Sequence, residues 1–154
     1  PLPLPSIPFP EIPIQIPGIT PVPPLGHLAA KISDMKNFSL ETYKKQKTRD
    51  EEVLDLHRIT LPLSVRMRKA GDTISPLGTQ GHKKLKDIFI DKKVPVQERD
   101  TIPIIVMNNR PLCALGVCID NKAKVTASTK KMVTLTFHRH DEKTTLQNKL
   151  FTDP

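Results

Sequence analysis

The sequence is poor in aromatic residues, and this narrows the kind of core it can build. Its 154 residues include no Trp, one Tyr and five Phe, so a core has to consist mainly of Ile, Leu and Val. No apolar run has the length of a membrane span, and no signal-peptide pattern is present. The length allows one domain with a modest core. We therefore expect a cytoplasmic domain without a membrane partner.

Cysteine is also scarce. The two cysteines, Cys113 and Cys118, are too few for a disulfide framework, and no zinc site follows from them. Their separation of five residues would place them on opposite faces of one strand, which disfavours a disulfide within that strand. We expect two buried free thiols in a reducing compartment.

Acidic residues are fewer than basic ones, and the imbalance is local. The chain has 24 Lys and Arg against 16 Asp and Glu, a formal net charge of +8. Residues 61–140 contain 15 basic and 6 acidic residues, a net charge of +9, whereas the remaining residues contain 9 and 10, a net charge of −1. The whole basic excess therefore lies in one segment, which indicates a polyanionic partner.

The segment with the basic excess begins with a predicted strand. Apolar residues recur there at every second position, as expected of a strand that buries one face: Leu61, Leu63, Val65 and Met67. Arg66 and Arg68 then share the opposite, exposed face. Gly71 and Asp72 end the strand, and the Gly/Pro-rich residues 71–81 predict a loop.

A short helix is predicted after this loop, over residues 82–91. Its apolar residues have i, i+3, i+4 spacing (Leu85, Ile88 and Phe89). Lysines lie in or near its first turn, where the helix dipole favours anions: Lys83, Lys84 and Lys86. A bound phosphate would accept hydrogen bonds from the free N–H groups and from these lysines. Pro95 suits the first turn of another short helix, over residues 95–100.

Nine basic residues fall within this one unit, residues 61–100, and predict a phosphate-binding surface without a catalytic group. They are Arg66, Arg68, Lys69, Lys83, Lys84, Lys86, Lys92, Lys93 and Arg99. The alternative is a solvated surface whose lysines keep the domain soluble.

The start of the chain is rich in proline. Residues 1–24 contain ten of the sixteen prolines, and because proline cannot donate to a β-ladder we expect extended or polyproline chain there. Residues 1–11 are interpreted as a linker or docked arm. The alternative is a ligand for an aromatic-lined groove on a partner. Alternation over residues 12–16, and a return over residues 27–32, predict a hairpin.

Strands are predicted for most of the remaining chain. Residues 33–52 predict an exposed connection or short helix, whose basic run at 44–49 is interpreted as solvated because acidic residues follow at once. Residues 101–107 and 111–119 predict a hairpin about Asn108 and Asn109. A final half-buried strand is predicted over residues 132–137.

These elements predict an α+β fold: a strand-rich single domain, residues 12–140, with one or two short helices. A polar tail, residues 141–154, follows it.

Three patterns resemble catalytic or metal sites but are incomplete: two histidines on one strand face (His138 and His140), two carboxylates one helical turn apart (Asp87 and Asp91), and a glycine- and lysine-containing loop (78–84). The histidines lack a third ligand at a recognisable spacing. The carboxylates lie among lysines, which favours a role in orienting Lys84 or Arg99. The loop lacks the first glycine and the Ser/Thr of a P-loop. We therefore expect no catalytic residue, metal or cofactor in this chain.

The central segment resembles the C-terminal domain of tRNA(Ile)-lysidine synthetase. The resemblance rests on an ordered set of short motifs: PLSVR at 62–66, GD at 71–72, PLG at 76–78, Gly81, KKLKD at 83–87, FID at 89–91, KVP at 93–95, ERD at 98–100 and IP at 102–103. It covers most of residues 14–137, more weakly toward the end. Cys113 and Cys118 stand where the family usually has Trp and Arg.

The resemblance implies a sandwich-like fold shared with a domain of phenylalanyl-tRNA synthetase. It also implies that the domain grips tRNA(Ile) on the acceptor-stem side, and we expect the nine clustered basic residues to make these contacts. The family's enzyme uses ATP and Mg in an N-terminal catalytic domain to convert the wobble cytidine to lysidine, and this chain lacks that domain's phosphate loop. The chain is thus expected to be an excised C-terminal piece, inactive alone, whose partners are tRNA(Ile) and the catalytic domain. The alternative is a protein-interaction module that contacts its partner through residues 1–24.

Overall fold

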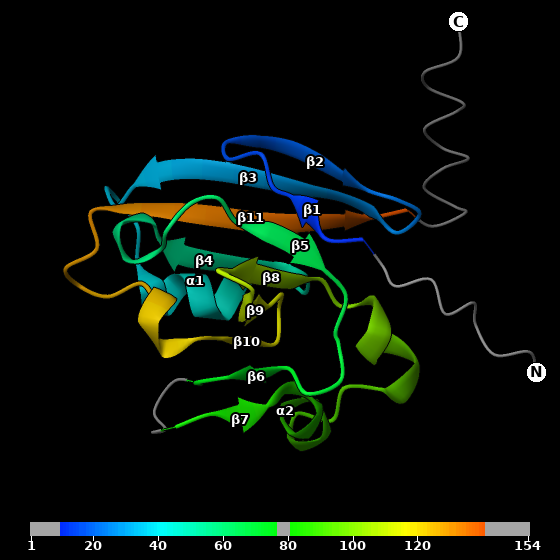
Figure 1. Cartoon of the computed structure of the whole chain (residues 1–154). Coiled ribbons are helices and arrows are strands. Elements are labelled where there is room, and N and C mark those ends of the chain that lie inside the picture. Colours follow the sequence, from blue (N-terminus) through cyan, green and yellow to red (C-terminus); the bar gives the residue numbers. More distant parts are fainter. Residues whose placement is uncertain (1–9, 77–80, 141–154) are drawn as a thin grey trace, which may run out of the picture.

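Two antiparallel β-sheets pack face to face in the computed structural model, which describes residues 10–76 and 81–140 (Figure 1). The first sheet has five strands in the spatial order β1 (Ile12–Pro13), β5 (Ser64–Arg66), β8 (Ile104–Met107), β9 (Arg110–Ala114) and β10 (Cys118–Ile119). The second has four, in the order β2 (Gly18–Val22), β3 (Gly26–Asp34), β11 (Lys131–Arg139) and β4 (Glu51–Asp55). The strand-rich α+β sandwich that the sequence predicts is therefore confirmed.

The smaller elements lie outside the two sheets. They are a two-stranded ribbon of β6 (Thr73–Ile74) and β7 (Lys83–Lys84), the helices α1 (Leu40–Gln46) and α2 (Leu85–Asp91), and 3-10 turns at Leu56–Arg58, Val96–Thr101 and Asn121–Ala123. No helix within residues 10–76 and 81–140 is both long enough and apolar enough to cross a membrane. Most of the proline-rich arm (1–9), the tip of the predicted loop (77–80) and the polar tail (141–154) lie outside the described residues.

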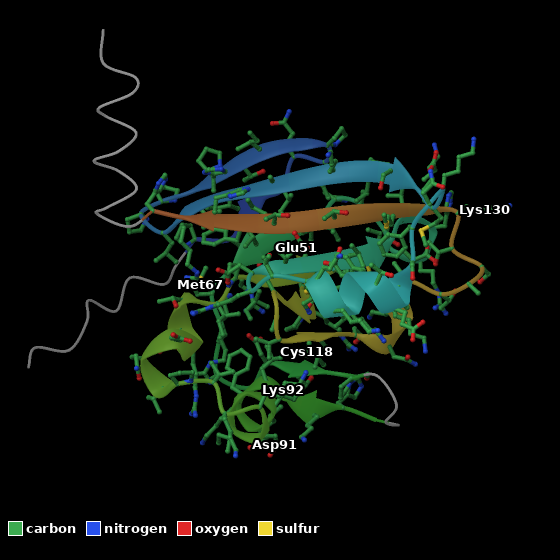
Figure 2. The ribbon with its side chains drawn as sticks, turned by 180° about the vertical axis from the view of Figure 1, so that it is seen from behind. Glu51, Met67, Asp91, Lys92, Cys118 and Lys130 are labelled. Atoms are coloured by element: carbon green, nitrogen blue, oxygen red, sulfur yellow. The ribbon has the colours of Figure 1, made fainter. Side chains whose placement is uncertain are left out.

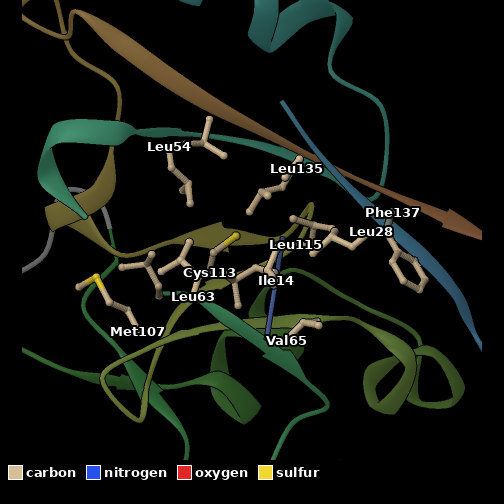
Figure 3. Packing of buried hydrophobic residues seen from close by; sticks show 14 of the residues in the cluster. Ile14, Leu28, Leu54, Leu63, Val65, Met107, Cys113, Leu115, Leu135 and Phe137 are labelled. Carbon is tan, nitrogen blue, oxygen red and sulfur yellow. The ribbon is translucent and has the colours of Figure 1, made fainter. Parts of the chain in front are cut away.

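The five-stranded sheet is buried on both faces, which explains its unbroken apolar sequences. In β8, Ile105 and Met107 face the main core between the two sheets (Figure 3), whereas Ile104 and Val106 face a second core beneath α2. A strand covered on both faces needs apolar residues at every position. The run at 101–107 therefore reflects two cores that share one sheet.

The long strand β11 holds the four-stranded sheet together. It pairs along all nine residues with β3 and along five with β4. Val133, Leu135 and Phe137 point into the main core, whereas Thr134 and Thr136 are half-buried on the other face. The predicted half-buried final strand is confirmed, with its pairing beginning at Lys131.

The predicted hairpin of residues 12–16 with 27–32 is wrong. Residues 12 and 13 instead join the other sheet as β1, where Ile12 pairs with Val65. The strand that returns as β3 is β2, and Leu25 N donates to Val22 O (2.9 Å) at the turn. Pro21 is tolerated in β2 because β2 is an edge strand.

The predicted return strand 111–119 is two strands, β9 and β10, separated by a turn at Gly116. Gly116 has φ +80, and a Cβ there would approach Asp50 N to 2.7 Å. Both the turn conformation and the close packing of Asp50 therefore require glycine at position 116. Cys113 consequently pairs with Ile119 on the adjacent strand, and Cys113 and Cys118 face different cores. Both thiols are buried and free, as predicted.

Candidate nucleic-acid interface

The ribbon β6–β7, the helix α2 and the lysines that follow it form what we call the basic unit (residues 73–76 and 81–93). Its ribbon pairs Thr73 with Lys84 and Ile74 with Lys83, and Leu85 N donates to Asp72 O (2.9 Å). Helix α2 buries Leu85, Ile88 and Phe89 in the second core. The predicted helix start at residue 82 is therefore wrong: Lys83 and Lys84 form a strand, and of the three lysines only Lys86 lies in the first turn.

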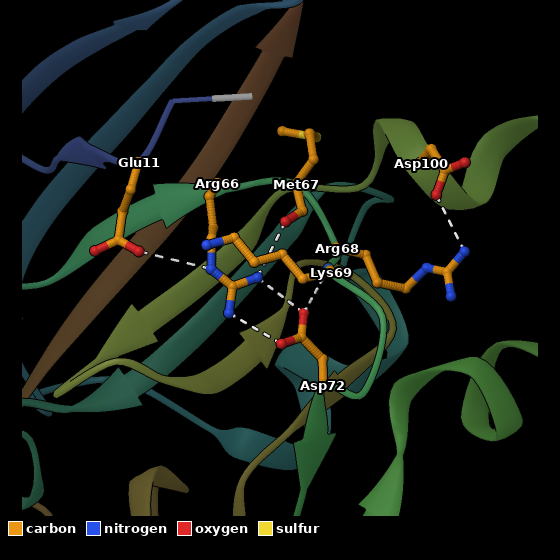
Figure 4. Close-up of polar contacts among 7 residues, drawn as sticks. All are labelled: Glu11, Arg66, Met67, Arg68, Lys69, Asp72 and Asp100. Atoms are coloured by element: carbon orange, nitrogen blue, oxygen red, sulfur yellow. Dashed lines mark hydrogen bonds and ion pairs between the residues drawn. The ribbon is translucent and has the colours of Figure 1, made fainter. Parts of the chain in front are cut away.

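Arg66 is buried, which corrects the prediction that it shares an open face with Arg68. Its guanidinium pairs with both carboxylate oxygens of Asp72 (Nη1–Oδ2 2.8 Å, Nη2–Oδ1 3.0 Å) and donates to Met67 O (3.1 Å) (Figure 4). Glu11 lies on its other side, 3.6 Å from Nε. The alternation in β5 correctly separates the apolar face from the face that carries Arg66. Residues 67–72, however, fold back over the Arg66 face and cover it.

Arg68 and Arg99 are half-buried and partly engaged within the protein. Arg68 pairs with Asp100 (3.1 Å), and its guanidinium carbon lies 5.9 Å from the centre of the Phe89 ring. Arg99 Nε donates to Val94 O (2.9 Å). A guanidinium has five N–H donors, so both arginines keep donors for a further acceptor.

The six lysines of the predicted surface are all exposed: Lys69, Lys83, Lys84, Lys86, Lys92 and Lys93. Lys83 forms an ion pair with Asp91, and Lys92 donates to Val117 O. The ammonium groups of the other four have no ion-pair partner among the described residues. The expectation that Asp87 and Asp91 orient Lys84 or Arg99 is wrong for Asp91, which pairs with Lys83, and Asp87 has no ion-pair partner in the part of the chain that the structure describes.

An open cleft of about 650 Å³ lies beside the basic unit, and we call it the lysine cleft. Five lysines line it, two from the predicted surface and three from elsewhere in the chain: Lys83, Lys92, Lys44, Lys47 and Lys124. Figure 2 shows Cys118, which lies in the cleft wall, close to Lys92. Sequence reasoning interpreted the run containing Lys44 and Lys47 as solvated, and nothing in the local sequence marks Lys124.

The charge in the cleft is positive. Its lining contains five lysines and two acids, Glu52 and Asp91, a net of three positive charges. Glu52 is buried and pairs with Lys47 (2.6 Å), and burial raises the pKa of its carboxyl while Lys47 opposes the rise. Burial raises the pKa of the Cys118 thiol to about 11, so this thiol is neutral at physiological pH.

The described residues include no group of three or more His, Cys, Asp or Glu side chains that could hold a metal ion. His138 instead stacks on His27, with ring centres 4.8 Å apart. The ammonium and guanidinium groups of the basic unit and the cleft are suited to binding anions.

The sequence and the fold of this chain are similar to those of known proteins. The family model described as the TilS substrate C-terminal domain matches residues 63–136. A tRNA(Ile)-lysidine synthase from Symbiobacterium thermophilum is 36% identical over 131 residues, which are 84% of this chain and 26% of that protein. The chain thus spans about a quarter of this relative's length.

Two solved structures share the fold. A crystal structure of a TILS C-terminal domain has a TM-score of 0.66 and 28% identity, covering 86% of this chain and 98% of that chain. An N-terminal fragment of the phenylalanyl-tRNA synthetase β-subunit from Pyrococcus horikoshii has a TM-score of 0.50 and 14% identity, covering 67% of this chain and 32% of the fragment. The two-sheet fold of this chain is thus the fold of a TilS substrate C-terminal domain. This chain belongs to the family of tRNA(Ile)-lysidine synthase C-terminal domains.

Proposed function

We propose that this domain binds tRNA(Ile) on the acceptor-stem side and holds it for a catalytic domain in the longer enzyme. That domain would convert the wobble cytidine to lysidine with ATP and lysine. The observation that supports binding is the exposure of three lysines on the basic unit that have no ion-pair partner among the described residues: Lys84, Lys86 and Lys93. The identity of the RNA comes from the names of the relatives.

Contacts to phosphates suit this surface. Double-stranded RNA is recognised mostly by its shape and through its backbone, and lysines supply point charges for that purpose. Arg68 and Arg99, whose guanidinium groups are held by the protein, add directional donors at the edge of the unit. Arg66 does not contact RNA in this proposal, because it is buried against Asp72. Comparisons provide no support for the alternative of a protein-interaction module.

Charge reversal at two free lysines tests the proposal. Lys84→Glu/Lys86→Glu should weaken tRNA binding by this chain about tenfold or more at low salt, because two phosphate contacts become repulsive. Within residues 10–76 and 81–140, neither lysine has an ion pair to break, whereas Lys83→Glu would place a second carboxylate beside Asp91. Affinity is measured by fluorescence anisotropy with labelled tRNA.

The matched control is Lys130→Glu/Lys131→Glu, the same change of charge at two adjacent exposed lysines. Figure 2 shows Lys130 near the start of β11, far from Lys92 and Asp91 at the end of α2. This variant should bind tRNA nearly as well as the unchanged chain. Equal losses of tRNA affinity in both variants would mean that only the net charge of the chain matters. That result would count against the basic unit as the binding site.

A further inference from the structure

The lysine cleft combines two properties that a plain phosphate-binding surface does not need together. Lysines line it, yet four apolar side chains in it are only half-buried: Leu40, Tyr43, Val117 and Ile119. Contacts to a duplex backbone are made by charged and polar groups and do not need an apolar wall. A half-exposed apolar wall beside that charge suits a ligand with a flat, weakly polar part attached to an anion.

We propose that the lysine cleft binds an unpaired nucleotide of the RNA, with its base against the apolar wall and its phosphates on the lysines. This rests on the proposed function, because it assigns a second contact to the same RNA. A tRNA provides such nucleotides where its unpaired 3′ end continues from the acceptor stem. Unpaired bases in RNA are commonly recognised by stacking on aromatic side chains, and Tyr43 supplies a ring here.

The charges in the cleft favour a nucleotide over a purely apolar ligand. Lys44 and Lys124 have no ion-pair partner among the described residues, so both ammonium groups are available to phosphates. Lys83, which also lines the cleft, belongs to the basic unit. One RNA strand that leaves the basic unit can therefore meet further lysines in the cleft.

The size of the cleft is also suitable. Small-molecule sites in proteins occupy about 300–1,000 Å³. The cleft, at about 650 Å³, lies within that range and has room for a base with its sugar. It is partly open to solvent, so an unpaired nucleotide can enter it.

Three RNAs test the proposal with the 154-residue chain: a blunt duplex, the same duplex with four unpaired 3′ nucleotides, and the same overhang made of abasic nucleotides. The abasic overhang keeps the phosphates and removes the bases. The normal overhang should bind about tenfold more tightly than the abasic one, the size expected for stacking of an unpaired base. Equal affinities for these two RNAs would overturn the proposal.

Val117→Trp fills the cleft and should remove this tenfold difference while leaving binding of the blunt duplex unchanged. The control is Val96→Trp, the same substitution at an exposed valine outside the cleft, which should keep the difference. Thermal unfolding of both variants verifies their folding. Retention of the full difference in folded Val117→Trp would place the base elsewhere and overturn the proposal.

A measurement without variants provides a second test. With 2-aminopurine as the unpaired base, binding to the unchanged chain should shield it from quenching by acrylamide. Unaltered quenching in the bound RNA would overturn the cleft proposal. It would not affect the proposal that the basic unit binds tRNA. Failure of the chain to bind any of the three RNAs would instead overturn the proposed function itself.

Discussion

Arg66 connects the end of β5 to the turn at residues 67–72. Its guanidinium reaches both oxygens of Asp72, and Asp72 in turn accepts from Lys69 N (2.8 Å). The side chains of Arg66 and Asp72 are 5% and 9% exposed. One ion pair therefore shapes the turn that leads into the basic unit, so the role of Arg66 is to position that unit.

Removing the charge of Asp72 should be costly. Asp72→Asn leaves the buried Arg66 without its main partner, and we expect a loss of about 3 kcal/mol in the free energy of unfolding. Asp100→Asn is the matched control, because Asp100 is a largely exposed partner of Arg68 and should cost under about 1 kcal/mol. Urea denaturation measures both. Similar losses would contradict a special role for the Arg66–Asp72 pair.

At the scale of elements, the pairing of β3 with β11 places histidines side by side. His27 lies opposite His138 in the register, and the ring of His140 is 6.0 Å from that of His27. The pKa of His27 is lowered, first by burial and then by the electrostatic effect of the neighbouring His138 and His140. This end of the sandwich is therefore sensitive to acid.

The lowered pKa of His27 predicts how stability changes with pH. The unfolded chain takes up a proton near the ordinary pKa of 6.5, before the folded chain does, so this contribution is present above pH 6.5 and is lost as pH falls through the folded pKa. Between pH 8 and pH 5, the thermal unfolding midpoint of His27→Gln should thus fall less than that of the unchanged chain. His57→Gln, at an exposed histidine, should leave the profile unchanged. A profile identical in all three proteins would refute the assignment to His27.

At the scale of the whole molecule, the sandwich supports a separate basic layer. The five-stranded sheet packs on the four-stranded sheet through one core and carries α2 on its other face through a second (Figure 1). The exposed lysines on and beside α2 are consequently held on the outer face of the five-stranded sheet. Electrostatic association should dominate how this molecule meets a polyanion.

The salt dependence of tRNA binding tests this electrostatic view. If about five lysines and arginines contact phosphates, log K should fall with log salt concentration with a slope of about −4 to −5. Lys84→Glu/Lys86→Glu should reduce the steepness by about 2, because each of the two lysines neutralises one phosphate in the unchanged chain. Lys130→Glu/Lys131→Glu should keep the original slope. A slope near zero in the unchanged chain would contradict binding through phosphates.

Local patterns and motifs in the sequence were sufficient to predict much of this protein's structure and its family. Alternation identified the apolar faces of β5 and β11, and helical spacing identified the residues that α2 buries, because each depends only on the geometry of its own element. The scarcity of cysteine indicated free thiols. The ordered motifs from residue 62 to residue 103 indicated the family, and with it the sandwich fold.

Tertiary structure alone decided which surfaces stay open. Alternation places Arg66 on the face opposite Val65, yet only the fold-back of residues 67–72 shows that this face is covered. Likewise, Lys44 and Lys124 join Lys83 in one cleft only because separate segments pack side by side. The physical reason is the same in both cases: a local pattern sets the direction of a side chain, whereas contacts between distant segments determine what that side chain meets.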